Sequence, residues 1–225
     1  MRKLVGIVAL HGLLLCSALV SAASQEAAER IAVGKKLLEQ GKVEAAISEF
    51  QKATTIDPKY SAAQLNLAYA YERANLSDEA IDAYRKSIEL ERRNFYARNN
   101  LGVLYSNKGL YDQAISEFQD ALKHEPGNAM ALKNLENAKK NKVVLQEREA
   151  VIAQAEKETE AKPDDPKPAY QLARVYATYG RKEQAIEWLG KAIQKGYKDL
   201  AYVKTDPAFA NIRDERDFQL LLLAK

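Results

Sequence analysis

The first half of the chain repeats every 34 residues, and this period limits the possible folds more than any other feature of the sequence. Gly102 lies 34 residues after Ala68, and Ala68 lies 34 residues after Gly34. A period of this length, with small and aromatic residues in phase, is typical of an array of helical repeats. The same step links three further sets of residues: Ala46, Ala80 and Ala114; Phe50, Tyr84 and Phe118; Ala53, Ser87 and Ala121.

One unit of this period, residues 95–128, predicts two helices joined by a tight turn. Gly109 suits the left-handed residue that follows a helix, and Asp112 is a candidate cap for the second helix. Pro126 ends that helix, because proline has no backbone N–H to donate. Gly102 is small where the two helices approach each other. Apolar residues recur at helical spacing in both halves of the unit: Leu101, Leu104 and Tyr105, then Ile115, Phe118 and Leu122.

These residues resemble the tetratricopeptide repeat. The first copy, residues 27–60, has Leu37 in place of the usual tyrosine, and the second, residues 61–94, has Arg92 in place of the usual proline. The resemblance implies an all-α fold, a right-handed superhelical array of helix-turn-helix repeats, or α-solenoid. The third copy matches the family pattern in order at Leu101, Gly102, Tyr105, Gly109, Ala114, Phe118, Ala121 and Pro126.

The N-terminal residues have the pattern of a secretory signal peptide. Residues 1–3 are basic at two positions, Leu4–Val20 is mainly apolar, and residues 21–23 are small, as a signal peptidase requires. We therefore expect residues 1–23 to be removed and the protein to be exported, most simply to the periplasm. A secreted protein and a retained membrane anchor are the alternatives, and contact with a membrane is expected only through this segment.

Cleavage would remove most of the reactive side chains. Cys16 and His11 would be lost, which leaves His124 as the one histidine and no cysteine, so a disulfide, a thiolate or a histidine-rich metal site is not expected. Losing Arg2 and Lys3 from the 34 basic residues leaves 32 against 31 acidic ones, a balance that gives no electrostatic reason to bind nucleic acid.

The sequence also lacks the motifs of an enzyme. It has no glycine-rich phosphate loop, and no Ser-His-Asp arrangement can be assembled around His124, which lies at a predicted helix end. We therefore expect no catalytic residues, no cofactor, no metal site and no small-molecule substrate.

Residues 129–161 are rich in Ala, Lys, Glu and Gln and contain neither proline nor glycine. They predict one long charged helix, or two helices that break near Asn141. An end helix with a polar outer side is what terminates a stack of repeats. The residues expected to cover the open face of the third repeat are Met130, Leu132, Leu135 and Ala138.

The C-terminal part returns to the repeat pattern. Residues 162–168 predict a stiff proline-rich linker, residues 169–197 a fourth tetratricopeptide-like repeat, and residues 198–225 capping helices. Gly180 is the next turn glycine, but it lies 71 residues after Gly109, three more than two periods. A cap is expected to start at Asp206 and Pro207 and to cover the last repeat with Phe209, Ile212, Phe218 and Leu222.

The resemblance also implies a binding surface, because the first helices of such repeats line a concave groove that holds an extended peptide or a partner helix. Asn66 and Asn100 either hold a peptide backbone or only bond neighbouring helices. A clamp for a C-terminal carboxylate is not expected, because Ile31 and Tyr96 stand where further cations are needed. The predicted groove residues are Lys35, Asn66, Tyr69, Arg73, Tyr96, Asn100, Val103 and Asn107.

The expected function is a non-catalytic scaffold in the cell envelope, which binds a protein or peptide partner in the groove of residues 27–128. The alternative is a structural component or assembly factor of an envelope complex, which self-associates through the middle helix or the C-terminal cap. The sequence leaves the partner, the pathway and the oligomeric state open.

Overall fold

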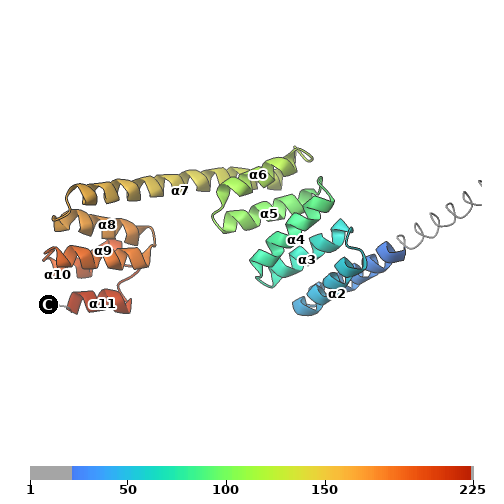
Figure 1. Cartoon of the computed structure of the whole chain (residues 1–225), viewed down its shortest axis with the longest axis horizontal. Coiled ribbons are helices and arrows are strands. Elements are labelled where there is room, and N and C mark those ends of the chain that lie inside the picture. Colours follow the sequence, from blue (N-terminus) through green and yellow to red (C-terminus); the bar gives the residue numbers. More distant parts are fainter. Residues whose placement is uncertain (1–21, 224–225) are drawn as a thin grey trace, which may run out of the picture. The chain divides into compact units, whose positions relative to one another are not determined.

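The computed structural model describes residues 22–223, and this part of the chain contains helices and no strand (Figure 1). The predicted all-α repeat architecture is confirmed. Two compact units meet after Lys142, inside the longest helix, and each is described by itself below. The helix of residues 22–39 is followed by α2 (Val43–Ile56), α3 (Ser61–Arg73), α4 (Ser77–Leu90), α5 (Phe95–Asn107), α6 (Tyr111–Leu122), α7 (Ala129–Ala161), α8 (Pro166–Thr178), α9 (Lys182–Gln194), α10 (Leu200–Thr205), the 3₁₀ helix η1 (Pro207–Phe209) and α11 (Arg216–Leu223).

The first unit contains three helix hairpins: residues 22–39 with α2, α3 with α4, and α5 with α6. Each turn has one residue with positive φ at the same place in the period, Gly41 at 74°, Asn75 at 59° and Gly109 at 73°. Only glycine and, at some cost, asparagine adopt this left-handed backbone readily. The cap predicted at Gly109 is therefore confirmed.

Small residues let the two helices of a hairpin pack closely. A Cβ atom added to Gly102 would lie 2.6 Å from Cε1 of Phe118, and one added to Gly34 would lie 2.5 Å from Cε1 of Phe50. Both rings are buried. The recurrence of a small residue and an aromatic ring in the sequence therefore reflects direct contact between the paired helices.

Asp112 does not cap its helix as predicted. The N-cap of α6 is Leu110, which makes no side-chain cap bond. Asp112 lies two residues further on, and its carboxylate instead accepts a hydrogen bond from Lys142 Nζ at 2.5 Å. One period earlier, Lys108 Nζ bonds Asp78 at 2.6 Å. The aspartate thus links successive repeats.

The first part of α7 stacks on the third repeat in the place of another first helix. Its N-terminus is capped by Asn128, whose Oδ1 accepts from Ala131 N at 3.1 Å. This bond repeats the cap of α5, where Asn94 Oδ1 accepts from Ala97 N at 3.1 Å. Ala138, two turns into α7, is buried in the core of the first unit.

The residues that cover the third repeat differ in part from the predicted ones. Ala131 and Ala138 are buried and Leu135 is partly buried, but Met130 is 52% and Leu132 46% exposed. Ala131, Leu135 and Ala138 are spaced by four and three residues and so share one side of the helix. Met130 and Leu132 each lie one residue, about 100°, around the helix from Ala131.

α7 is a single helix from Ala129 to Ala161, although a hairpin turn is due within it. Val143 lies 34 residues after Gly109, at the position where the turns of the repeats require positive φ. A β-branched residue pays a large steric penalty for that backbone conformation, whereas it remains compatible with a helix. The chain therefore continues as a helix at the position where each of the three preceding repeats forms its turn.

In the second unit, α8 and α9 form a further hairpin, with Gly180 at φ 75° in its turn. The expected linker is shorter than residues 162–168, because α8 begins at Pro166. Its cap is Asp165, which accepts from Lys167 N at 3.0 Å. Prolines are accommodated in the first turn because the N–H groups there have no partner within the helix.

The C-terminal segments close the core of the second unit, as predicted. Asp206 caps η1 by accepting from Ala208 N at 3.0 Å, and it is completely buried. Its Oδ2 also accepts from the hydroxyl of Tyr170 at 2.5 Å and lies 2.8 Å from Nε of Arg174. The four residues expected to cover the last repeat are all buried: Phe209, Ile212, Phe218 and Leu222.

Candidate partner-binding groove

The eight predicted groove residues lie on the first helices of the three hairpins in the first unit. Lys35 is on the helix of residues 22–39, and the others are on α3 and α5. Exposed side chains are Lys35, Tyr69, Arg73, Tyr96 and Asn107, whereas Asn66, Asn100 and Val103 are half-buried.

Two tyrosines give this surface an aromatic character. Tyr69 on α3 is 41% exposed and Tyr96 on α5 is 63% exposed. Arg73 Nη1 lies 3.5 Å from the hydroxyl of Tyr69, one turn along the same helix. Tyr96 packs edge-on against the buried ring of Phe95, with ring centroids 5.5 Å apart. Exposed tyrosines of this kind often anchor a protein partner, because each offers a large apolar face and one polar tip.

A hollow of about 320 Å³ lies where α3 and α5 begin. Tyr96 lines it, and it is the one predicted groove residue that does so. Charged residues of both signs surround it, and their mixture favours no single charge on a ligand. The lining residues are Ser61, Ala62, Leu65, Glu91, Arg93, Asn94, Phe95, Tyr96 and Glu125.

The two asparagines predicted to contact a peptide both bond to the protein itself. Asn66 Nδ2 donates to the carbonyl of Ala62 at 2.6 Å, one turn earlier in α3. Asn100 Nδ2 donates to the hydroxyl of Tyr84 at 3.1 Å. Asn100 therefore bonds a neighbouring helix, and its contact with a peptide stays a prediction.

Asn100 belongs to a line of hydrogen bonds that joins four helices. The Tyr84 hydroxyl on α4 donates to Glu72 Oε2 on α3 at 2.9 Å. Asn100 Oδ1 accepts from Asn99 Nδ2 at 3.4 Å, and Asn99 Oδ1 accepts from Asn134 Nδ2 on α7 at 3.2 Å. Burial, reinforced by the Glu72 carboxylate, raises the pKa of Tyr84, so its hydroxyl stays protonated and able to donate. This line fixes the helices beneath the groove.

Two residues of this surface were missed from the sequence, although the 34-residue step identifies them. Asn134 lies 34 residues after Asn100, and Met130 lies 34 residues after Tyr96. Met130 is exposed like Tyr96, and Asn134 is half-buried like Asn100. Carrying the period past Asn128 into the charged helix would have found both.

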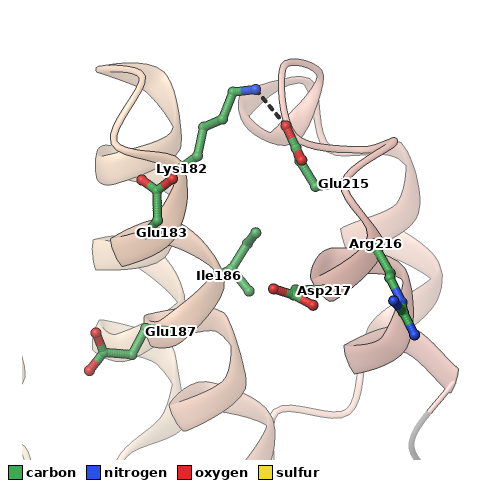
Figure 2. Close-up of a pocket in the computed structure, with 7 residues that line it drawn as sticks. All are labelled: Lys182, Glu183, Ile186, Glu187, Glu215, Arg216 and Asp217. Atoms are coloured by element: carbon green, nitrogen blue, oxygen red, sulfur yellow. Dashed lines mark hydrogen bonds and ion pairs between the residues drawn. The ribbon is translucent and has the colours of Figure 1, made fainter.

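The second unit has a separate hollow of about 490 Å³ between α9 and the start of α11 (Figure 2). Ile186 and Asp217 point into it, whereas Glu187 and Arg216 point away. Lys182 Nζ closes one side through an ion pair with Glu215 at 2.5 Å. This open and mainly charged hollow lacks the enclosed, largely apolar walls typical of small-molecule sites.

The described residues show neither a metal site nor a membrane span. Across residues 22–223, no three His, Cys, Asp or Glu side chains come together as metal ligands. His124 is exposed in the turn after α6. None of the helices from residue 22 to residue 223 combines the length and the apolar character needed to cross a bilayer. The predicted signal peptide lies almost entirely outside the described residues.

Comparison with known families identifies the hairpins. A family model described as "TPR repeat" matches residues 34–75, and models described as "Tetratricopeptide repeat" match residues 83–116 and residues 61–94 and 167–194. The matched segments are therefore similar to tetratricopeptide repeats. These matches cover hairpins of both units but not α7.

Solved structures show the same fold. The first tetratricopeptide domain of Spaghetti (RPAP3), bound to the HSP90 peptide SRMEEVD, aligns with 52% of this chain and 93% of its own at 26% identity and a TM-score of 0.51. The first such domain of human RPAP3 aligns with 55% of this chain and 98% of its own at 22% identity and a TM-score of 0.53. MamA aligns with 79% of this chain and 96% of its own at 22% identity and a TM-score of 0.50. No curated protein sequence matches the chain.

Proposed function

We propose that the chain is a non-catalytic scaffold, which binds a segment of a protein partner in the groove of its first three tetratricopeptide repeats. Tetratricopeptide repeats are in general interaction modules without catalytic activity. The proposed mechanism is complementarity between the partner segment and a preformed surface on the first helices of the repeats.

One observation carries the proposal: a similar domain, that of Spaghetti (RPAP3), holds the HSP90 peptide SRMEEVD. The groove of this chain supplies features suited to a peptide. Tyr69 and Tyr96 are exposed, and Tyr96 lines a hollow of about 320 Å³. The helices below them are held together by the line of hydrogen bonds through Tyr84 and Asn100.

The peptide recognised is expected to differ from one held by its C-terminal carboxylate. Ile31 is buried and Tyr96 carries no charge, so two of the positions where a carboxylate clamp needs cations have none. We therefore expect SRMEEVD with a free C-terminus to bind this chain no more tightly than the same peptide with an amidated C-terminus. A marked preference for the free carboxylate, measured by fluorescence anisotropy, would contradict this part of the proposal.

The test places a photo-crosslinking amino acid at Tyr96 in intact cells and identifies the adducts by mass spectrometry. The matched control is Tyr202, a 46% exposed tyrosine on α10 in the second unit. We expect a defined partner peptide to be crosslinked from position 96 and not from position 202.

The captured peptide then gives a quantitative test. Removing an anchor aromatic side chain at an interface typically costs about 2 kcal/mol, which corresponds to roughly 30-fold in affinity. We expect Tyr69→Ala and Tyr96→Ala each to weaken binding to this extent, and Tyr202→Ala to leave it unchanged. Equal adducts from positions 96 and 202, or full affinity in both groove variants, would refute the groove as the binding site.

The proposal includes export to the cell envelope, with the periplasm as the location. Its support is the basic start, apolar run and small residues of positions 1–23. The N-terminal sequence of the protein purified from its own cells tests this. A start at Ala23 or Ser24 supports export with cleavage, whereas an intact Met1 contradicts cleavage.

A further inference from the structure

The fourth repeat carries a hollow of about 180 Å³ inside the second unit. Three of its residues correspond to predicted groove residues of the third repeat, by the same 71-residue step that separates the turn glycines of the two repeats. They are Gln171, Arg174 and Thr178, which correspond to Asn100, Val103 and Asn107. The hollow therefore lies on the face of α8 that carries the candidate groove in the first unit. Its complete lining is Val151, Gln171, Arg174, Val175, Thr178 and Tyr179.

Arg174 is held in place at the wall of this hollow by a buried carboxylate. Its Nε lies 2.8 Å from Oδ2 of Asp206, which is completely buried. Its Nη1 donates to Oε1 of Gln171 at 2.9 Å, whereas its Nη2 has no partner among the described residues. The side chain is 35% exposed, so solvent reaches part of it. A guanidinium held in this way loses little conformational freedom on binding, and its planar fork of N–H groups fits a carboxylate.

A second arginine comes to the hollow from α7. Cζ of Arg148 lies 5.8 Å from the ring centroid of Tyr179, which lines the hollow. Arg148 is exposed and takes part in no ion pair within residues 22–223, whereas the adjacent Glu149 is already paired with Arg181. A contact with an aromatic ring restrains an arginine without neutralising its charge. Two guanidinium groups are therefore associated with one hollow, Arg174 in its wall and Arg148 on the ring of Tyr179.

The charge of the hollow favours an anion, and its size favours a single side chain. None of the six lining residues, all of them in the described part of the chain, is acidic. Arg174 balances the charge of Asp206, so Arg148 supplies the charge in excess. Gln171 accepts from Arg174 through its amide oxygen, and its amide nitrogen can therefore donate to the same ligand. Small-molecule pockets usually measure roughly 300–1,000 Å³, so this smaller hollow suits one side chain of a larger partner.

We propose that the fourth repeat is a second recognition site, which binds an acidic side chain of a protein partner. Arg174 donates hydrogen bonds to the carboxylate, and Arg148 attracts it electrostatically. The occupant is a glutamate or an aspartate of a protein, because the hollow matches one side chain in size and a carboxylate in charge. This inference goes beyond the proposed function and does not depend on it, since all the residues concerned belong to the second unit.

An NMR titration of the purified protein tests the site directly, because each arginine Nε–Hε group gives its own signal. The probe is a blocked tetraglutamate peptide, and its matched control is the same peptide made of glutamine. We expect the signals of Arg174 and Arg148 to shift with the glutamate peptide and not with the glutamine peptide. The signal of Arg216, an exposed arginine on α11, should stay in place. Equal shifts with both peptides, or shifts with inorganic phosphate and not with the glutamate peptide, overturn the proposal.

Three variants then measure what each arginine contributes to binding of the glutamate peptide. Arg148→Gln changes an exposed side chain and is expected to weaken binding roughly two- to fivefold, as for an exposed ion pair. Arg174→Lys keeps a cation beside Asp206 but lacks the planar fork, so we expect a loss of about tenfold or more. Arg216→Gln is the matched control and should leave binding unchanged.

The fluorescence of Trp188 checks that the second unit stays folded in each variant. If Arg174→Lys does not fold, Arg148→Gln and the Arg174 signal of the unaltered protein decide. Full affinity in Arg148→Gln together with an unshifted Arg174 signal, or an equal loss in Arg216→Gln, overturns the proposal.

Discussion

Replacing Tyr84 by phenylalanine should destabilise the first unit through the loss of one hydroxyl group. The ring position is the same in every repeat of this unit, and phenylalanine already occupies it at Phe50 and Phe118. All three rings are buried. The substitution therefore leaves the packing intact and removes only the central atom of the line of hydrogen bonds.

The magnitude follows from the two bonds that this hydroxyl makes. It donates to the Glu72 carboxylate at 2.9 Å and accepts from Asn100 Nδ2 at 3.1 Å. A hydrogen bond to a charged group contributes about 1.5–3 kcal/mol and one between neutral groups about 0.5–1.5 kcal/mol. Glu72 and Asn100 are both half-buried, so water replaces part of each bond in the variant. We expect a net loss of about 1–2 kcal/mol in the free energy of unfolding.

The assay is urea denaturation followed with two signals. Far-ultraviolet circular dichroism reports the helices of both units, whereas the fluorescence of Trp188, the one tryptophan of the chain, reports the second unit. We expect Tyr84→Phe to shift the dichroism transition of the first unit to lower urea and to leave the fluorescence transition in place. A shift of both transitions would mean that the effect is not confined to the line of hydrogen bonds.

The reverse substitution one repeat later is the matched control. Phe118→Tyr places a hydroxyl at the equivalent position of the third repeat. There, Ser106 and Asn134 take the places that Glu72 and Asn100 have around Tyr84. The hydroxyl of Ser106 is buried and has no partner. We expect this variant to change the free energy of unfolding by less than about 0.5 kcal/mol. A cost equal to that of Tyr84→Phe, or a neutral Tyr84→Phe, would refute the reasoning.

Three further outcomes follow from the core and from the tyrosines. Gly102→Ala should destabilise the first unit by about 1–2 kcal/mol, because the new Cβ meets the ring of Phe118, whereas Gly127→Ala, with open space around it, should be neutral in the same urea titration. Asp206→Ala should cost about 3 kcal/mol or more in the fluorescence transition, since it leaves a buried tyrosine hydroxyl and an arginine without their partner. Burial and a hydrogen bond to a glutamate raise the pKa of Tyr176 to about 12, so this residue keeps its proton when folded but loses it near pH 10 when unfolded. The contribution of Tyr176 to the stability of the second unit should therefore be constant below pH 10 and fall between pH 10 and 12, and Tyr176→Phe should reduce that slope.

The repeats could be predicted from the sequence because their signals are local and recur. Gly109 marks a turn by its backbone freedom, and Gly102 marks a helix contact by its size, so both are recognisable without the structure. The cap predicted at Asp112 was wrong because the partner of this side chain lies far away in the sequence. Its carboxylate reaches Lys142, thirty residues away, and a cap cannot be distinguished from such a contact by its position in the sequence.

The helices that carry the predicted groove residues could be identified from the sequence, but the hydrogen bonds of their polar side chains could not. Its position in the repeat identified Asn100 as part of the inner face. Its amide donates a hydrogen bond to Tyr84 on the neighbouring helix, and no sequence motif predicts that bond. Asn134 was overlooked because residues 129–161 differ in composition from the repeats. Composition changes there since most of that helix is exposed, and the period is kept only at positions near its start, such as Ala131, Asn134 and Leu135.

Val143 marks the place where the series of hairpins in the first unit ends. The positions that pack α7 onto the third repeat keep the period, whereas Val143 replaces the turn glycine, and Glu136 and Arg148 replace the small residues Gly102 and Ala114 of the preceding repeat. The end of the series therefore coincides with the loss of both the turn residue and the small residues at the helix contact. In the growth of such a chain by duplication, a copy of residues 95–128, which contains Gly109, would add a hairpin, whereas a copy of residues 129–162 would lengthen a helix.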